Sequence, residues 1–179
     1  MQLYIEKEII LGEICVIISL MGFMGAGKTS VGKILAKRLD YDLYDTDLVI
    51  REQTGLSIKK IFSIHGEEYF RCLESEVLKQ IIEQNDDIVI ATGGGIVLSE
   101  QNIYYLKKYT LPILLEVSPF AVYQRLKAKS RPLIETENQL ESIKKLMRER
   151  EELYNVFSNK IDSVKNSPED VVEEILQLI

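Results

Sequence analysis

Short apolar runs alternate along this chain with longer stretches in which apolar positions recur at helical spacing. Apolar runs that could form strands occupy residues 13–21 (EICVIISLM), 42–45, 87–92 (DIVIAT), 112–117 (PILLEV) and 161–164. A continuous apolar run is typical of a strand that is covered on both faces. Helical spacing predicts helices over residues 28–39, 48–53, 58–84, 99–109, 119–129, 140–157 and 167–178, with breaks near Gly55 and Gly66. This alternation predicts an α/β fold, a five-stranded parallel sheet flanked by helices.

The length and composition fit one folded domain over residues 1–179. Hydrophobic residues make up 46% of the chain and charged residues 28%, which excludes an intrinsically disordered chain. The formal net charge of −6 argues against a nucleic-acid partner. No linker or internal repeat divides the chain, and the least apolar stretch, residues 127–139, is expected to be a mobile surface loop.

The N-terminal region lacks the pattern of a targeting or membrane segment. Residues 9–24 are rich in apolar side chains, but Glu13 interrupts them and no basic stretch precedes them. The protein is therefore expected to be cytoplasmic and without a membrane partner, with residues 1–12 as an edge strand or a loose arm. The two cysteines, Cys15 and Cys72, have no metal or disulfide spacing and are interpreted as free thiols. The one histidine, His65, cannot build a histidine-rich metal site and is interpreted as a residue at a helix end.

Residues 22–29 read GFMGAGKT and match the phosphate-binding pattern G-x-x-x-x-G-K-[ST]. The glycines let backbone N–H groups turn toward an anion, and the helix that follows directs its positive end at the same place. Lys28 is expected to neutralise the β and γ phosphates of a nucleotide, and the Thr29 hydroxyl to bind magnesium. The other interpretation, a glycine-rich turn with a solvated lysine, requires the strand and helix on either side to be coincidental.

Asp45 and Asp47 follow the second predicted strand, two residues apart. If the strand continued that far, alternation would put both carboxylates on one face. One carboxylate could then hold magnesium and the other could accept a hydrogen bond from an attacking hydroxyl. The alternative is that Asp45 or Thr46 caps the next helix.

The segment Gly93–Gly95 ends another buried strand and would place bare backbone at the same edge of the sheet. Its N–H groups could be donated to a ligand, or the segment could simply be a tight turn.

Two arginines interrupt or border apolar helical faces. Arg71 borders the stripe of residues 70, 73, 77 and 81, with Glu74 three residues later, and Arg150 lies within the stripe of residues 143, 147, 154 and 157. Such arginines suit bidentate capture of a carboxylate or phosphate, although internal salt bridges would explain them equally well. A third, Arg131, precedes Pro132 and Leu133 in the polar loop, where it could close over a transferring phosphate or lie on a plain surface loop.

Together the segments GFMGAGKTS, LYDTD, GEEYFRCLE, ATGGG, SRPLI and MREREELY resemble the shikimate kinase family, in the right order over about residues 12–179. The resemblance implies a P-loop NTPase fold of the nucleoside-monophosphate-kinase type, a three-layer sandwich. It implies ATP-dependent phosphorylation of the 3-hydroxyl of shikimate, on the route to chorismate and the aromatic amino acids, by a monomer that uses Mg²⁺.

The resemblance also implies roles by position. The nucleotide-binding loop would be Gly25, Ala26, Gly27, Lys28, Thr29 and Ser30, with magnesium at Thr29 and Asp45. The substrate would be held by Asp47, Arg71, Gly94 and Arg150, with residues 46–84 as the substrate-binding helices. The catalytic set would be Lys28, Asp45, Asp47 and Arg131, the last on a lid of residues 127–139. Arg125 and residues 167–168 would lie on the adenine side.

The chain departs from the family pattern at two places. Residues 1–12 precede the usual start, and Cys72 stands where a polar or charged residue is familiar. Packing against a neighbouring helix is the expected role of Cys72. Two other functions remain open: a kinase for another small hydroxy acid such as gluconate, and a nucleotide-dependent switch, which would need no pocket for a small carboxylate.

Overall fold

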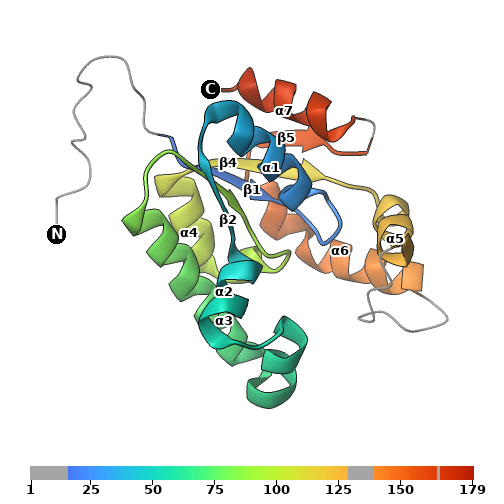
Figure 1. The fold of residues 1–179 in the computed structure, drawn as a ribbon. Coiled ribbons are helices and arrows are strands. Elements are labelled where there is room, and N and C mark those ends of the chain that lie inside the picture. The colour runs from blue at the N-terminus through green and yellow to red at the C-terminus, as the bar shows by residue number, and fades with distance from the viewer. Residues whose placement is uncertain (1–15, 129–138, 165) are drawn as a thin grey trace.

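The computed structural model describes residues 16–128, 139–164 and 166–179, and its centre is a five-stranded sheet (Figure 1). The strands are β1 (Ile18–Met21), β2 (Asp42–Asp45), β3 (Ile88–Ala91), β4 (Leu111–Glu116) and β5 (Asn159–Asp162). They pair in the order β2-β3-β1-β4-β5, and every neighbouring pair is parallel. The predicted α/β fold with a five-stranded parallel sheet is therefore confirmed.

The helices lie close to the predicted ranges. They are α1 (Lys28–Leu39), α2 (Thr46–Thr54), α3 (Ile58–Gln84), α4 (Glu100–Tyr109), α5 (Pro119–Ala128), α6 (Gln139–Asn155) and α7 (Pro168–Leu176), with a 3₁₀ turn, η1 (Ile96–Leu98). Ser99 accepts a hydrogen bond from the Asn102 N–H and caps α4. Gly66 breaks the helical dihedral angles inside α3, with φ 85° and ψ 173°. Within the described ranges, no helix is long and apolar enough to cross a membrane.

The sheet is buried on both faces because alternate residues of its strands enter two different apolar clusters. Ile18 and Leu20 of β1 pack with side chains of α1 and α7. Met21 of β1 and Ile90 of β3 pack on the opposite face with side chains of α3, α4 and α6. The result is the three-layer arrangement visible in Figure 1, which explains why these strands are continuous apolar runs.

The strand order brings three chain segments to one edge of the sheet. The segment after β1 is the 22–27 loop, the segment after β2 begins α2, and the segment after β3 is Gly93–Gly95. Because β2, β3 and β1 are neighbours and parallel, their carboxyl ends lie side by side. Ligands of open α/β sheets bind at this edge.

Candidate active site

The loop between β1 and α1 adopts a conformation that depends on its glycines. Gly22, Gly25 and Gly27 have φ values of 140°, 78° and 103°, in the region that side-chain-bearing residues rarely adopt. Gly27 is the N-cap of α1, which has neither a side-chain cap nor an acidic residue in its first turn. The positive end of α1 is therefore open to an anion held by the loop.

Lys28 opens α1 and is 8% exposed. Its Nζ donates hydrogen bonds to the carbonyl oxygens of Gly22, at 2.7 Å, and Phe23, at 3.1 Å. These bonds hold the ammonium group against the inner side of the loop, where a phosphate bound by the loop would meet it.

Asp45 links the end of β2 to both Thr29 and the start of α2. Its Oδ1 accepts hydrogen bonds from the N–H groups of Asp47 and Leu48, and so caps the helix. Its Oδ2 accepts a hydrogen bond of 2.8 Å from the Thr29 hydroxyl. The capping alternative and the pairing with Thr29 are thus both observed, on different oxygens of one carboxylate.

The expectation that Asp45 and Asp47 share a strand face is wrong, because the strand ends at Asp45 and the chain turns into α2 at Thr46. The first helical turn, not strand alternation, sets the direction of Asp47. The buried Thr46 hydroxyl accepts a hydrogen bond of 2.9 Å from the Gly93 N–H, which ties this helix start to the glycine segment.

Asp47 and Glu74 meet at the glycine segment. A Cβ built on Gly93 would lie 2.8 Å from Oδ1 of Asp47 and 2.6 Å from Oε1 of Glu74. Across the parts of the chain that the structure describes, Glu74 Oε1 is the only buried side-chain oxygen or nitrogen without a hydrogen-bond partner. Glycine at position 93 therefore lets two carboxylates from different helices approach the same stretch of backbone.

Arg71 is braced by two carboxylates on its own helix. Its Nη1 donates to Glu74 Oε2 at 2.7 Å, as the spacing of three residues predicts, and its Nη2 donates to Glu67 Oε1 at 3.0 Å. Burial lowers the pKa of Arg71, but these carboxylates more than offset it and the pKa is raised. Burial raises the pKa of Glu74, with a further contribution from Asp47, while Arg71 opposes the shift only in part. The predicted internal salt bridge exists, and it also orients the Arg71 guanidinium.

The Arg71 guanidinium lies directly against Gly95, which makes that glycine a test of the site. The backbone of Gly95, with φ −111° and ψ 5°, suits other residues, but an added Cβ would lie 2.6 Å from Nη2 of Arg71. We expect Gly95→Ala to fold and to displace Arg71, since the obstructing group is the end of a flexible side chain. If the site holds the small acid that the sequence resemblance implies, loss of a charged hydrogen bond should raise the KM for that acid about ten- to a hundredfold and leave the KM for the nucleotide unchanged.

Steady-state kinetics of Gly95→Ala, Arg71→Ala and the double variant measure this effect. The two losses should not add, because both changes remove the same interaction. An unchanged KM in Gly95→Ala would show that the position of Arg71 does not matter.

Arg150 and Tyr154 approach the glycine segment from α6. Arg150 Nη1 donates to the Gly94 carbonyl at 3.0 Å, and the Tyr154 hydroxyl donates to the same oxygen at 2.8 Å. The Arg150 guanidinium carbon lies 5.7 Å from the centre of the Phe23 ring, which belongs to the phosphate loop. Arg150 thus lies between the phosphate loop and the glycine segment, and it faces inward as its place on the apolar stripe predicts.

Comparison with known proteins decides the family. A sequence model described as shikimate kinase matches residues 24–179, which is most of the chain. The chain belongs to the shikimate kinase family. The shikimate kinase of Thermodesulfovibrio yellowstonii is 45% identical over 161 residues, covering 89% of this chain and 92% of that protein.

Solved structures agree with this assignment to the shikimate kinase family. The shikimate kinase of Acinetobacter baumannii, solved in complex with shikimate, is 35% identical, with a TM-score of 0.86 over 93% of each chain. A gluconokinase from Sinorhizobium meliloti is 14% identical, with a TM-score of 0.56 over 93% of this chain and 92% of that one, and shares the fold alone. The predicted resemblance is confirmed, and the gluconate kinase alternative is not favoured.

Three further sequence predictions for this shikimate kinase family member have mixed outcomes. Arg125 donates to the carbonyls of Gly25, at 2.8 Å, and Ser163, at 2.6 Å, and so contacts the phosphate loop. Its place on the adenine side stays a prediction. Arg131 lies outside the described residues, as do most of the predicted lid and residues 1–12. The expectation that Cys72 packs against a helix is wrong, because Cys72 is exposed.

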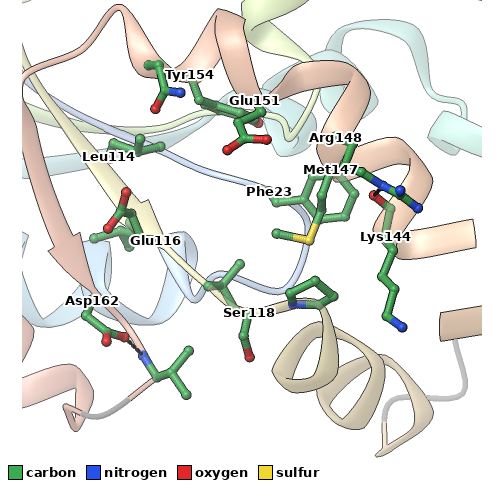
Figure 2. A pocket seen from close by; sticks show the side chains of 15 residues that line it. Phe23, Leu114, Glu116, Ser118, Lys144, Met147, Arg148, Glu151, Tyr154 and Asp162 are labelled. Atoms are coloured by element: carbon green, nitrogen blue, oxygen red, sulfur yellow. Dashed lines mark hydrogen bonds between the residues drawn. The ribbon is translucent and has the colours of Figure 1, made fainter. Parts of the chain in front are cut away.

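The sequence patterns of the shikimate kinase family did not reveal everything near the site. Hydrogen bonds from Tyr154 to Gly94 and from Arg71 to Glu67 have no signal beyond helical spacing. A cavity of about 710 Å³ lies beside α6, and Phe23 and Tyr154 form part of its wall (Figure 2). Figure 2 shows Lys144 on one side of it and Glu116 on the other; Arg71, Arg150 and the glycine segment do not line it.

Proposed function

We propose that this chain transfers the γ-phosphoryl group of ATP to the 3-hydroxyl of shikimate, giving shikimate 3-phosphate and ADP. The observation that carries the proposal is the convergence of Asp47, Arg71 and Arg150 on the glycine segment, next to the phosphate loop. A nucleotide-dependent switch needs only the loop. Two arginines and a carboxylate around bare backbone suit an acceptor that carries one carboxylate and several hydroxyls.

The nucleotide would be held by backbone more than by side chains. Residues Gly25 to Ser30 would surround its phosphates with N–H groups at the open end of α1. Lys28 would meet the β and γ phosphates, where charge builds up during phosphoryl transfer.

The acceptor would be fixed by its carboxylate. Arg71 and Arg150 would grip that group, with the Gly94 N–H as a further donor, and so set the register of the ring. Asp47 would accept a hydrogen bond from the reacting hydroxyl and take its proton as the bond to phosphorus forms. The unpartnered Glu74 oxygen beside Asp47 offers a second acceptor for a substrate hydroxyl.

The residues present fit a magnesium ion. Thr29 Oγ1 and Asp45 Oδ2 are hard oxygen donors 2.8 Å apart, while the other Asp45 oxygen is committed to capping α2. Among the described residues no cluster of three or more metal-binding side chains exists. That scarcity suits Mg²⁺, which is usually held by one or two protein oxygens together with substrate phosphates. When bound there, Mg²⁺ would neutralise phosphate charge.

Three parts of the proposal rest on sequence. Arg131 would contact the ATP phosphates from the lid of residues 127–139 and help to exclude water. The enzyme would act as a monomer, as the family resemblance implies. It would work in the cytoplasm on small molecules, and its net charge of −6 disfavours nucleic acid.

Replacing Arg150 with alanine should mainly raise the KM for shikimate. The change removes a charged donor from the carboxylate but leaves the loop and Asp47 in place, so the KM should rise about ten- to a hundredfold. Arg148→Ala is the matched control, because Arg148 is exposed on the same helix. Steady-state kinetics with varied shikimate measure the effect, and an unchanged KM would remove Arg150 from the substrate site.

Identifying the product tests the proposal. The chain is incubated with ATP, Mg²⁺ and shikimate, and the mixture is examined by phosphorus and proton NMR. We expect ADP and a monoester whose phosphorus couples to the proton on carbon 3. Inorganic phosphate in place of an ester would indicate nucleotide hydrolysis and contradict the proposed transfer.

A further inference from the structure

Tyr154 contacts the substrate site only through backbone. It follows Arg150 by four residues on α6, so the two side chains lie on one face of the helix. Tyr154 is 9% exposed, and its hydroxyl donates 2.8 Å to the Gly94 carbonyl. Arg150 donates 3.0 Å to the same oxygen. A carbonyl oxygen has two lone pairs, and these two donors occupy both.

The glycine segment depends on such bonds because it has no side chains of its own. Its first residue is held by Thr46, whose hydroxyl accepts the Gly93 N–H at 2.9 Å. The Gly93 carbonyl accepts the Ile96 N–H at 3.2 Å. The middle residue, Gly94, is held by the two donors from α6. Without the tyrosine hydroxyl, Arg150 would be the one side chain of α6 bonded to the Gly94 carbonyl in the described structure.

The shared acceptor also affects Arg150. A guanidinium has five N–H donors in a fixed plane, and here one of its nitrogens is anchored to Gly94. A carbonyl that is held by a second donor is a fixed anchor, and a fixed anchor gives the remaining N–H groups a defined direction. A carbonyl free to rotate would let the guanidinium shift with it.

We propose that Tyr154 is a positioning residue for the acceptor substrate: its hydroxyl fixes the Gly94 carbonyl, and through it the backbone and the Arg150 guanidinium that would hold the shikimate carboxylate. This inference rests on the proposed function. It assigns Tyr154 no contact with substrate and no part in proton transfer.

The titration of Tyr154 agrees with a donor role. Burial raises the pKa of its hydroxyl, Arg150 and Arg71 oppose the shift, and Glu74 adds to it. The group therefore stays protonated, and remains a donor, throughout the pH range in which a kinase works. Its removal should lower activity by the same factor at every pH.

The test compares Tyr154→Phe with Tyr44→Phe. Each variant loses one hydroxyl. Tyr44, on the edge strand β2, donates at 2.9 Å to Oδ1 of Asn85, the residue that follows α3. For Tyr154→Phe we expect the KM for shikimate to rise about three- to tenfold, kcat to stay within about twofold, and the KM for ATP to be unchanged. Tyr44→Phe should match the parent in all three. Shikimate binding by calorimetry should weaken by the same factor in Tyr154→Phe alone.

Thermal unfolding of both variants separates positioning from stability. A lower unfolding temperature of Tyr154→Phe with an unchanged KM and an unchanged calorimetric affinity would overturn the inference and leave a structural role. Loss of one limb of the profile of kcat/KM against pH would also overturn it, because a hydroxyl that only donates supplies no titrating group to that profile. If the parent chain itself does not phosphorylate shikimate, the proposed function fails. Calorimetry of shikimate binding then still tests Tyr154 separately.

Discussion

Replacing Lys28 with alanine is expected to lower kcat by about a thousandfold or more while the chain remains folded. The ammonium group is held at the loop by the carbonyls of Gly22 and Phe23, at 2.7 and 3.1 Å. Among the described lysines, Lys28 alone stands at the start of the helix that follows the phosphate loop. Because phosphoryl transfer depends on stabilising charge rather than on covalent help from the protein, loss of this cation should affect the chemical step more than ATP affinity.

Two companion variants show whether the loss is chemical. Lys28→Met keeps most of the buried stem and should be as inactive as Lys28→Ala, while Lys33→Met removes an exposed lysine from the same helix and should be fully active. Single-turnover kinetics, ATP binding and thermal unfolding are measured on all three. A Lys28→Met enzyme with parental kcat would exclude Lys28 from phosphate stabilisation.

Replacing Asp47 with asparagine should lower kcat about a hundred- to ten-thousandfold, since the amide cannot take a proton from the acceptor hydroxyl. The change is nearly isosteric, and the capping bonds of α2 come from Asp45, so the helix should persist. Its main structural consequence is electrostatic: Asp47 contributes to the raised pKa of Glu74, and its neutralisation should lower that pKa toward the ordinary value.

Kinetics and calorimetry on Asp47→Asn distinguish a role in taking the proton of the reacting hydroxyl from a role in holding the substrate alone. If Asp47 acts on the reacting hydroxyl, kcat falls and shikimate still binds. Glu52→Gln, an exposed change on α2, serves as the control and should behave like the parent. Turnover of Asp47→Asn at the parental rate would assign the proton to another group.

The phosphate loop and the layers around it could be predicted because local rules determine them. The pattern at residues 22–29, the apolar run before it and the helical spacing after it all agree, and α1 begins at Lys28 as predicted. Continuous apolar strands indicated a parallel sheet, because helices cover both of its faces.

The sequence predicts that Asp45 and Asp47 belong to the site, but it does not predict how the two carboxylates are oriented. Extrapolating strand alternation placed both on one face, whereas the helix begins at Thr46 because Asp45 itself caps it. The Gly93 N–H also bonds to the Thr46 hydroxyl, 47 residues away in sequence, and ties this helix start to the segment after β3. Sequence spacing does not show such a contact.

Arg71 and Tyr154 also show that sequence spacing predicts contacts within one helix but not contacts between distant segments. The three-residue spacing of Arg71 and Glu74 predicted their ion pair, which the structure confirms. Spacing does not say that Glu74 also lies beside Asp47, or that Gly95 leaves room for the guanidinium, because those contacts join α3 to the segment after β3. Tyr154 was visible only as an apolar-face residue, and its hydroxyl acquires a role when α6 meets Gly94.

The central claim is that the convergence of Asp47, Arg71 and Arg150 beside the phosphate loop makes this family member a kinase for shikimate. A coupled ADP-release assay with ATP and Mg²⁺, comparing shikimate, gluconate and no added acceptor, tests it most directly. We predict rapid ADP release with shikimate alone. Equal, slow release in all three reactions, or rapid release with gluconate, would contradict the claim, and would leave Arg71 and Arg150 with a structural role or a different acceptor.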